Sequence, residues 1–169
     1  MASTDKILRS LGVPALIYKD PPTTANSKIT DNFIANIDTM LREGKSIFFN
    51  LRDGVEGSKL AAVVLRAAIE EGYLKARYIT PENIADSKAE SWDSGDKWQE
   101  YLDCDLLVID RIVFTNLDNF KLKSLYDLIE KRLLNQKSTL MVSEEDVKSN
   151  VPDRVKNLFN HAEVKLVRE

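Results

Sequence analysis

The sequence has one cysteine, one histidine and no long apolar run, and each shortage excludes a class of protein. Cys104 is the single cysteine among 169 residues, so the chain cannot form an internal disulfide, and this thiol beside an apolar run is expected to be buried. His161 has no cysteine or acidic cluster beside it and does not predict a metal site. No apolar stretch approaches the ~20 residues that span a bilayer, and the first residues lack the apolar core of a signal peptide. We therefore expect a soluble protein of the cytoplasm, without a membrane partner.

An excess of charge of either sign is also lacking. Lys and Arg number 24 against 27 Asp and Glu, which gives a net charge of −3. Such a chain has no general field for nucleic acid or an anionic membrane, so any DNA contact needs a local patch. With 43% hydrophobic residues, the chain is long enough to bury the core of one domain.

Short apolar runs alternate with helical patterns. Strands that alternate with helices predict an α/β fold with a mostly parallel sheet covered by helices on both faces. We expect residues 1–27, with their Pro- and Thr-rich end, to form an arm or connector, and residues 28–169 to form the domain. The predicted strands are 46–51, 76–80, 105–110, 138–143 and 163–167, the predicted helices are 30–43, 60–71, 120–134 and 152–159, and the polar stretch 86–96 is predicted to be a mobile loop.

The residues after the first predicted strand partly match a phosphate-binding loop, G-x-x-x-x-G-K-[ST]. In that loop backbone N–H groups surround an anion at a helix N-terminus, the lysine reaches the outer phosphates, and the hydroxyl holds magnesium. Counting back from Lys59, the first glycine is Asp53, the second is Ser58, and the hydroxyl position is Leu60. Three of the four fixed positions therefore differ.

Two glycines remain inside this segment, which we expect to be a loop. Asp53 and Glu56 add negative charge where phosphates would lie. The motif alone favours an ordinary strand-to-helix turn with an exposed lysine over a working phosphate site. If the chain does bind ATP with magnesium, the candidate nucleotide-binding residues are Gly54, Gly57, Ser58 and Lys59.

An aspartate ends the third predicted strand. The carboxyl edge of a parallel sheet is the usual ligand edge, so Asp110 is the candidate magnesium-associated acid. A second role is equally open, in which Asp110 pairs locally, for example with Lys59. The next residue is Arg111, where a water-activating acid would be expected.

These pieces, in their order along the chain, resemble the ATPase domain of replicative-helicase loaders of the DnaC/DnaI type, which are relatives of the AAA+ initiators and of IstB-like transposition helpers. The resemblance covers nearly the whole chain and implies a P-loop NTPase-like, AAA+/RecA-like fold. It rests on the runs 11–18, 44–49, 60–62, 105–110, 126–132 and 138–143.

The resemblance also implies a function and the partners that go with it. It implies an accessory protein of DNA replication, encoded by a bacterium or by a phage and then acting in the host cytoplasm. A replicative helicase or another replication protein would be the partner, and a homo-oligomer is possible. Because Leu60, Arg111 and Glu144 occupy the positions of the metal hydroxyl, the activating acid and the sensor asparagine, we expect weak or no ATP hydrolysis.

Arg154 resembles the arginine that such proteins present to a neighbouring subunit. A solvated arginine on a helix surface is the alternative. Trp92 and Trp98 could anchor a partner or stack on a base, but packing against their own domain is the preferred interpretation.

Two other functions stay open. The first is an active ATP-dependent loader or transposition helper in which Lys59 and Asp110 still manage nucleotide and magnesium. The second is a single-stranded DNA-binding module with a local basic patch, formed by Lys121, Lys123, Lys131, Arg132 and Lys137.

Overall fold

Five parallel strands form the centre of the molecule in a computed structural model, which describes residues 3–22, 28–91 and 96–168. Their order in the sheet is β2-β3-β4-β1-β5, so the chain leaves β1 for the far edge and returns strand by strand. The predicted parallel sheet is confirmed. The strands are β1 (Ile47–Asn50), β2 (Ala76–Ile79), β3 (Leu106–Ile109), β4 (Ser138–Val142) and β5 (Lys165–Arg168).

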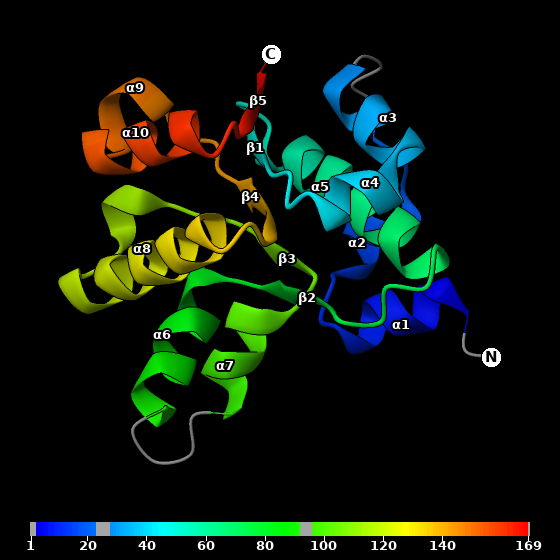
Figure 1. Ribbon diagram of the computed structural model, residues 1–169, viewed down its shortest axis with the longest axis horizontal. Coiled ribbons are helices and arrows are strands. Elements are labelled where there is room, and N and C mark those ends of the chain that lie inside the picture. Colours follow the sequence, from blue (N-terminus) through cyan, green and yellow to red (C-terminus); the bar gives the residue numbers. More distant parts are fainter. Residues whose placement is uncertain (1–2, 23–27, 92–95, 169) are drawn as a thin grey trace.

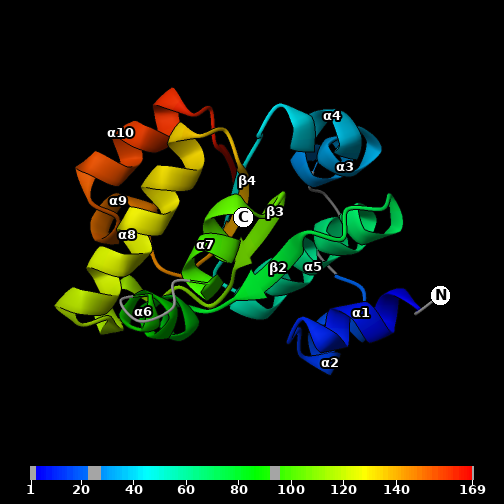
Figure 2. The same cartoon turned by 60° about the horizontal axis from the view of Figure 1, so that its bottom comes forward.

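The helices lie in two layers, one on each face of the sheet (Figures 1 and 2). One layer holds α1 (Thr4–Ser10), α2 (Ala15–Lys19), α3 (Lys28–Ala35), α4 (Ile37–Arg42) and α5 (Gly54–Glu70). The other holds α6 (Pro81–Glu90), α7 (Asp96–Asp103), α8 (Asn119–Leu134), α9 (Val147–Asn150) and α10 (Asp153–His161), with a 3-10 turn, η1, at Phe114–Asn116. None of the described helices combines the length and apolar character needed to cross a lipid bilayer.

Alternate side chains of each strand feed two separate cores. In β1, Ile47 and Phe49 join the core beneath α1–α5, whereas Phe48 points to the opposite face and packs with Phe159 of α10. This is the two-residue period of a strand, and it explains why the strand sequences are almost wholly apolar: both faces are covered.

The first predicted helix is in fact two helices. Residues 30–43 were expected to be continuous, but α3 ends at Ala35, α4 begins at Ile37, and Asn36 between them has non-helical dihedral angles of −119° and 32°. The predicted loop at 86–96 was wrong at 86–90, which belong to α6, and at Asp96, where α7 begins, and residues 92–95 lie outside the described residues.

Only one of the two tryptophans is among the described residues. Trp92 lies outside the described residues. Trp98 is only 6% exposed, and the ammonium of Lys88 lies 4.2 Å from its ring centroid. The preferred interpretation, packing against its own domain, is confirmed for Trp98.

The segment predicted to be an arm packs on α5. Leu8, Val13 and Ile17 are buried in the core that α5 shares with the sheet. Arg66 of α5 lies 2.6 Å from the carboxylate of Asp5 and donates to the carbonyl of Tyr18 at 3.0 Å. The boundary at residue 27 stays a prediction.

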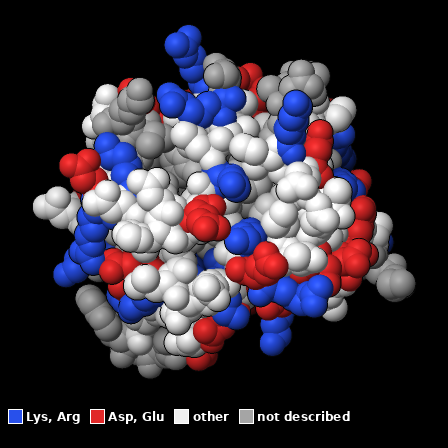
Figure 3. Space-filling view, turned by 45° about the horizontal axis from the view of Figure 1, so that its top comes forward, with Lys and Arg blue, Asp and Glu red and all other residues white. Residues whose placement is uncertain are grey.

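Arg132, one of the five residues of the predicted basic patch, is inside the protein. It is 0% exposed, and its guanidinium donates to the carbonyls of Tyr101, Leu102, Cys104 and Ser138 and to the hydroxyl of Thr139. The patch as predicted is therefore wrong at this position. Figure 3 shows basic and acidic side chains interspersed on one face of the molecule, in keeping with the balanced charge of the sequence.

The helices enter the strands through a recurring left-handed turn. Gly44, Gly72, Gln136 and Glu163 have positive φ angles of 68°, 102°, 53° and 54° and follow α4, α5, α8 and α10. In each turn the next residue donates back to a carbonyl five residues earlier, as in Lys45 to Met40 at 2.9 Å, which is the Schellman pattern of a helix end.

Gly44→Ala is expected to destabilise the protein much more than Gly72→Ala. Both substitutions strain a left-handed residue, at a cost of about 1–2 kcal/mol. A Cβ at Gly44 would also lie 1.9 Å from the Gln136 carbonyl oxygen, whereas nothing lies within 4 Å of a Cβ at Gly72. Denaturant unfolding of the two variants measures the difference, and equal losses of unfolding free energy would show that the Gly44–Gln136 approach is not a constraint.

Candidate nucleotide site

A pocket of about 460 Å³ lies at the carboxyl edge of the sheet. It is lined by residues that follow β1, β3 and β4, with one wall from α2, and this is the edge at which open α/β sheets bind ligands. The volume is within the roughly 300–1,000 Å³ of small-molecule sites. Of the predicted nucleotide and metal residues, the pocket brings together Gly54, Ser58 and Asp110.

Helix α5 begins earlier than the sequence suggested. Residues 52–59 were predicted to be a glycine-containing loop, but α5 starts at Gly54, so only Leu51–Asp53 separate it from β1. Gly57 lies inside the helix where α5 approaches the sheet, and a Cβ there would be 3.0 Å from the Cγ1 of Val142. The loop prediction was wrong because this glycine serves close helix–strand packing.

Asp53 caps the new helix start. Its carboxylate Oδ1 accepts hydrogen bonds from the backbone N–H of Val55 at 3.0 Å and of Glu56 at 3.3 Å. Free amides at a helix N-terminus are the groups that bind phosphate. Here a carboxylate of the chain itself occupies two of them.

A second carboxylate lies over the same helix start. Glu144, at the position of the expected sensor asparagine, follows β4, and a Cβ on Gly54 would be 2.9 Å from its Oε2. Acidic groups from two segments, Asp53 and Glu144, therefore lie beside the first turn of α5, while Arg111 is a cation in the lining of the pocket.

Asp110 is 1% exposed and fully engaged by hydrogen bonds. Its Oδ1 accepts from the Ser58 hydroxyl at 2.7 Å and from the Arg111 backbone N–H at 2.8 Å, and its Oδ2 accepts from the Tyr78 hydroxyl. Burial first, and then the charge of Asp110, raise the pKa of Tyr78 well above its usual value, so this phenol stays a donor.

The predicted alternative partner for Asp110 is not the observed one. Among the described residues Lys59 makes no ion pair, and it lies on α5 one residue beyond the serine that does bind Asp110. Within that same part of the chain, His, Cys, Asp and Glu do not gather in any group of three or more that could hold a metal.

Arg154 lies outside this pocket. It is on α10, its side chain is 80% exposed, and its Nη2 is 2.6 Å from Oε2 of Glu130 on α8. The solvated helix-surface alternative matches its exposure, with the addition of this ion pair.

Sequence reasoning missed two contributors to the site. Tyr78 sits on β2 and carried no motif, so only the folded sheet places it beside Asp110. Asp53 was noted as a lost glycine, although an Asp followed by a helical pattern is also a helix cap, and that signal was available.

No protein-family model and no curated protein sequence matches the chain. Solved structures do match it. The replication initiator DnaA bound to AMPPCP and single-stranded DNA is similar over 93% of this chain, with a TM-score of 0.68 and 16% identity. The DnaC helicase loader is similar over 90%, with a TM-score of 0.63 and 18% identity. The chain has the AAA+ fold.

The AAA+ neighbours differ in how much of their length they share with this chain. AMPPCP-bound DnaA from Aquifex aeolicus matches with a TM-score of 0.64 and 17% identity. The chain spans 44–50% of the two DnaA structures and 97% of the DnaC loader. The fold shared with these structures confirms the expected three-layer P-loop NTPase-like class.

Tyr78→Phe is expected to change how stability depends on pH. Because the pKa of Tyr78 is raised in the folded state, the unfolded chain loses this proton near pH 10 while the folded chain keeps it, so stability falls as pH rises above that value. The contribution is about 1.4 kcal/mol per pH unit. Denaturant unfolding between pH 9 and 11 should show a shallower decline for Tyr78→Phe, together with a loss of about 1–3 kcal/mol at neutral pH, where Asp110 lacks one donor. Parallel declines would contradict this role of Tyr78.

Proposed function

We propose that this chain is an AAA+-related accessory protein of DNA replication that acts through protein contacts, with weak or no ATP hydrolysis. The fold it shares with the DnaA initiator and the DnaC loader supports the link to replication. The expected loss of hydrolysis is inferred from the start of α5. There the Asp53 carboxylate accepts hydrogen bonds from two backbone amides that could otherwise bind phosphate.

The acidic groups at the start of α5 oppose a triphosphate there, and Arg111 is the one pocket-lining cation among the described residues. A bound phosphate at the start of α5 would have to displace the Asp53 carboxylate from two amides and lie beside Glu144. Two unit charges 4 Å apart repel by about 1 kcal/mol in water and about 4 kcal/mol near a protein surface. At the near-surface value one such contact is enough to move a micromolar affinity into the millimolar range, which is a thousandfold or about 4 kcal/mol.

The two positions expected to hold magnesium, residues 60 and 110, are also not free to do so. Leu60, at the position of the metal hydroxyl, is 4% exposed in the core, and Asp110 is buried under three donors. Magnesium would have to break these hydrogen bonds to reach Asp110. ATP and magnesium are therefore not required in the proposed function, and a replicative helicase or another replication protein is the proposed partner.

Calorimetric titration with ATP and with ADP, each with and without magnesium, tests the proposal. We expect no micromolar binding to the whole chain and no difference for Lys59→Ala, because Lys59 lies on a helix flank rather than in a phosphate loop.

Micromolar ATP binding would overturn the nucleotide part of the proposal. Micromolar, magnesium-dependent ATP binding that Lys59→Ala abolishes would replace this proposal with an active ATP-dependent loader. Phosphate release from ATP, measured with the same two proteins, separates tight binding alone from turnover.

A further inference from the structure

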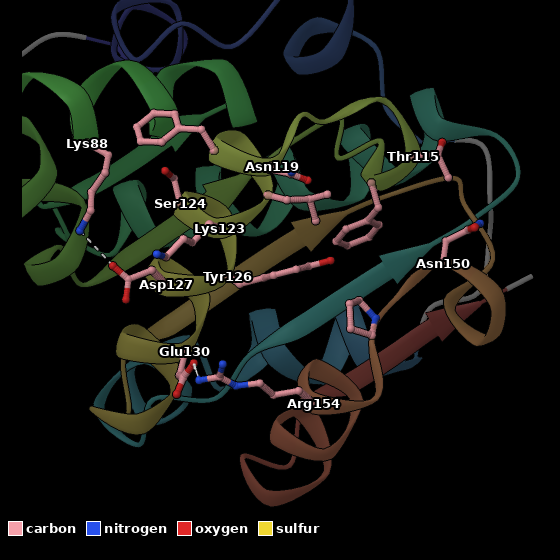
Figure 4. A pocket seen from close by; sticks show the side chains of 14 residues that line it. Lys88, Thr115, Asn119, Lys123, Ser124, Tyr126, Asp127, Glu130, Asn150 and Arg154 are labelled. Atoms are coloured by element: carbon pink, nitrogen blue, oxygen red, sulfur yellow. Dashed lines mark hydrogen bonds and ion pairs between the residues drawn. The ribbon is translucent and has the colours of Figure 1, made fainter.

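A groove of about 1,080 Å³ runs beside α8, on the opposite layer from α5. One wall is α8, and the other is formed by η1 and by residues 150–154 (Figure 4). It shares no lining residue with the candidate nucleotide site. Its lining follows α8 from Asn119 to Glu130, about three helical turns, a length that suits a polypeptide segment.

The floor of the groove is apolar and aromatic. The rings of Phe114 and Tyr126 stack with centroids 6.3 Å apart, and Leu122 and Pro152 complete the apolar lining. Phe120 lies at one end and is 43% exposed. Apolar surface in such a hollow marks a site that another apolar face can cover.

Most charges that line the groove are already neutralised within the chain. Lys88 lies 3.0 Å from Asp127, and Arg154 reaches from α10 to Glu130 at 2.6 Å (Figure 4). Lys123 also lines the groove, and among the described residues it makes no ion pair. The charge left without an opposite is therefore positive.

The position of Lys123 near the start of α8 also favours an acidic partner. Lys121 and Lys123 lie in the first two turns of α8, which has no acidic residue in its first turn beyond the Asp118 cap. Cations are unfavourable at this end of a helix because they face the positive end of its dipole. An acidic side chain of a partner would pair with Lys123 and would also lie favourably at the positive end of the α8 dipole.

We propose that this groove binds an amphipathic helix of a partner protein, with its apolar face on Phe114, Leu122 and Tyr126 and an acidic side chain beside Lys123. The inference deepens the proposed function, since it rests on action through protein contacts and names the surface that makes them. A helix laid in a groove is a common mode of peptide recognition. Single-stranded nucleic acid fits less well, because the other cations of the groove already pair with Asp127 and Glu130, and one lysine gives little attraction for a run of phosphates.

Selection from a displayed library of random peptides about 15 residues long, which is roughly four helical turns, tests the proposal with the whole chain as bait. Peptides that bind the wild type are selected, and the variants enter only afterwards, when affinities are measured. The recovered peptides should carry Asp or Glu beside apolar residues at helical spacing. Their synthetic versions should shift the backbone amide NMR signals of residues 114–126 and 150–154.

Lys121→Glu is the matched control, because it makes the same charge change on the same helix at a residue that does not line the groove. We expect Lys123→Glu to weaken the recovered peptides about tenfold and Lys121→Glu to leave them within about twofold. Both variants should fold, since each replaces a cation at the positive end of α8.

Three results would overturn the inference: no peptide that depends on Lys123, equal losses in the two variants, or NMR shifts away from the groove. Oligothymidylate that binds the groove and depends on Lys123 would replace the partner helix with nucleic acid. Because the ATP titration concerns a separate pocket, failure here leaves the nucleotide part of the proposed function standing. ATP binding, in turn, would overturn that part alone.

Discussion

The buried carboxylate of Asp110 organises the carboxyl edge of the sheet. A buried charge is tolerated only when it is paired or fully hydrogen-bonded, and Asp110 receives donors from β2, from α5 and from its own backbone turn. The same three contacts fix the position of α5 against β3 and β2. Removing one donor leaves a buried charge short of a partner, so these groups act as one network rather than as separate bonds. A carboxylate used in this way is structural.

Arg132 is a second buried charge, and it lies near the start of β4, at the amino edge of the sheet. Burial lowers the pKa of its guanidinium, yet it has five polar partners, most of them carbonyls at the end of α7 and the start of β4. Tyr101 and Leu102 are in the last turn of α7, where carbonyls have no amide of the helix to accept from, so the arginine and the helix terminus satisfy each other. Cys104 lies against this cluster, and burial raises the pKa of its thiol, so it remains a protonated, packed side chain.

The strands were predictable from the sequence, whereas the site was less so. Apolar runs such as 105–110 and 138–143 are short and continuous, and only a strand covered on both faces fits them. The start of α5 was missed because glycines suggest a loop, while here Gly57 makes room for Val142. Arg132 follows buried Leu128 by four residues, which puts it on the inner face of α8. Its charge suggested exposure, and only its distant carbonyl partners explain its burial. Tyr78 on β2 contacts Asp110 at the end of the neighbouring strand β3, a contact that no local pattern contains.

The left-handed turns after α4, α5, α8 and α10 lie at the amino edge of the sheet and are held by backbone hydrogen bonds. The carboxyl edge has backbone hydrogen bonds too, such as Ser143 N–H to the Phe49 carbonyl at 3.0 Å, and it also carries the side-chain contacts of Asp53, Ser58, Tyr78 and Asp110. Main-chain hydrogen bonds thus support both edges, and the side chains of the carboxyl edge add the chemistry of the site. Residues at the ligand edge can therefore change while the strands keep their order and register.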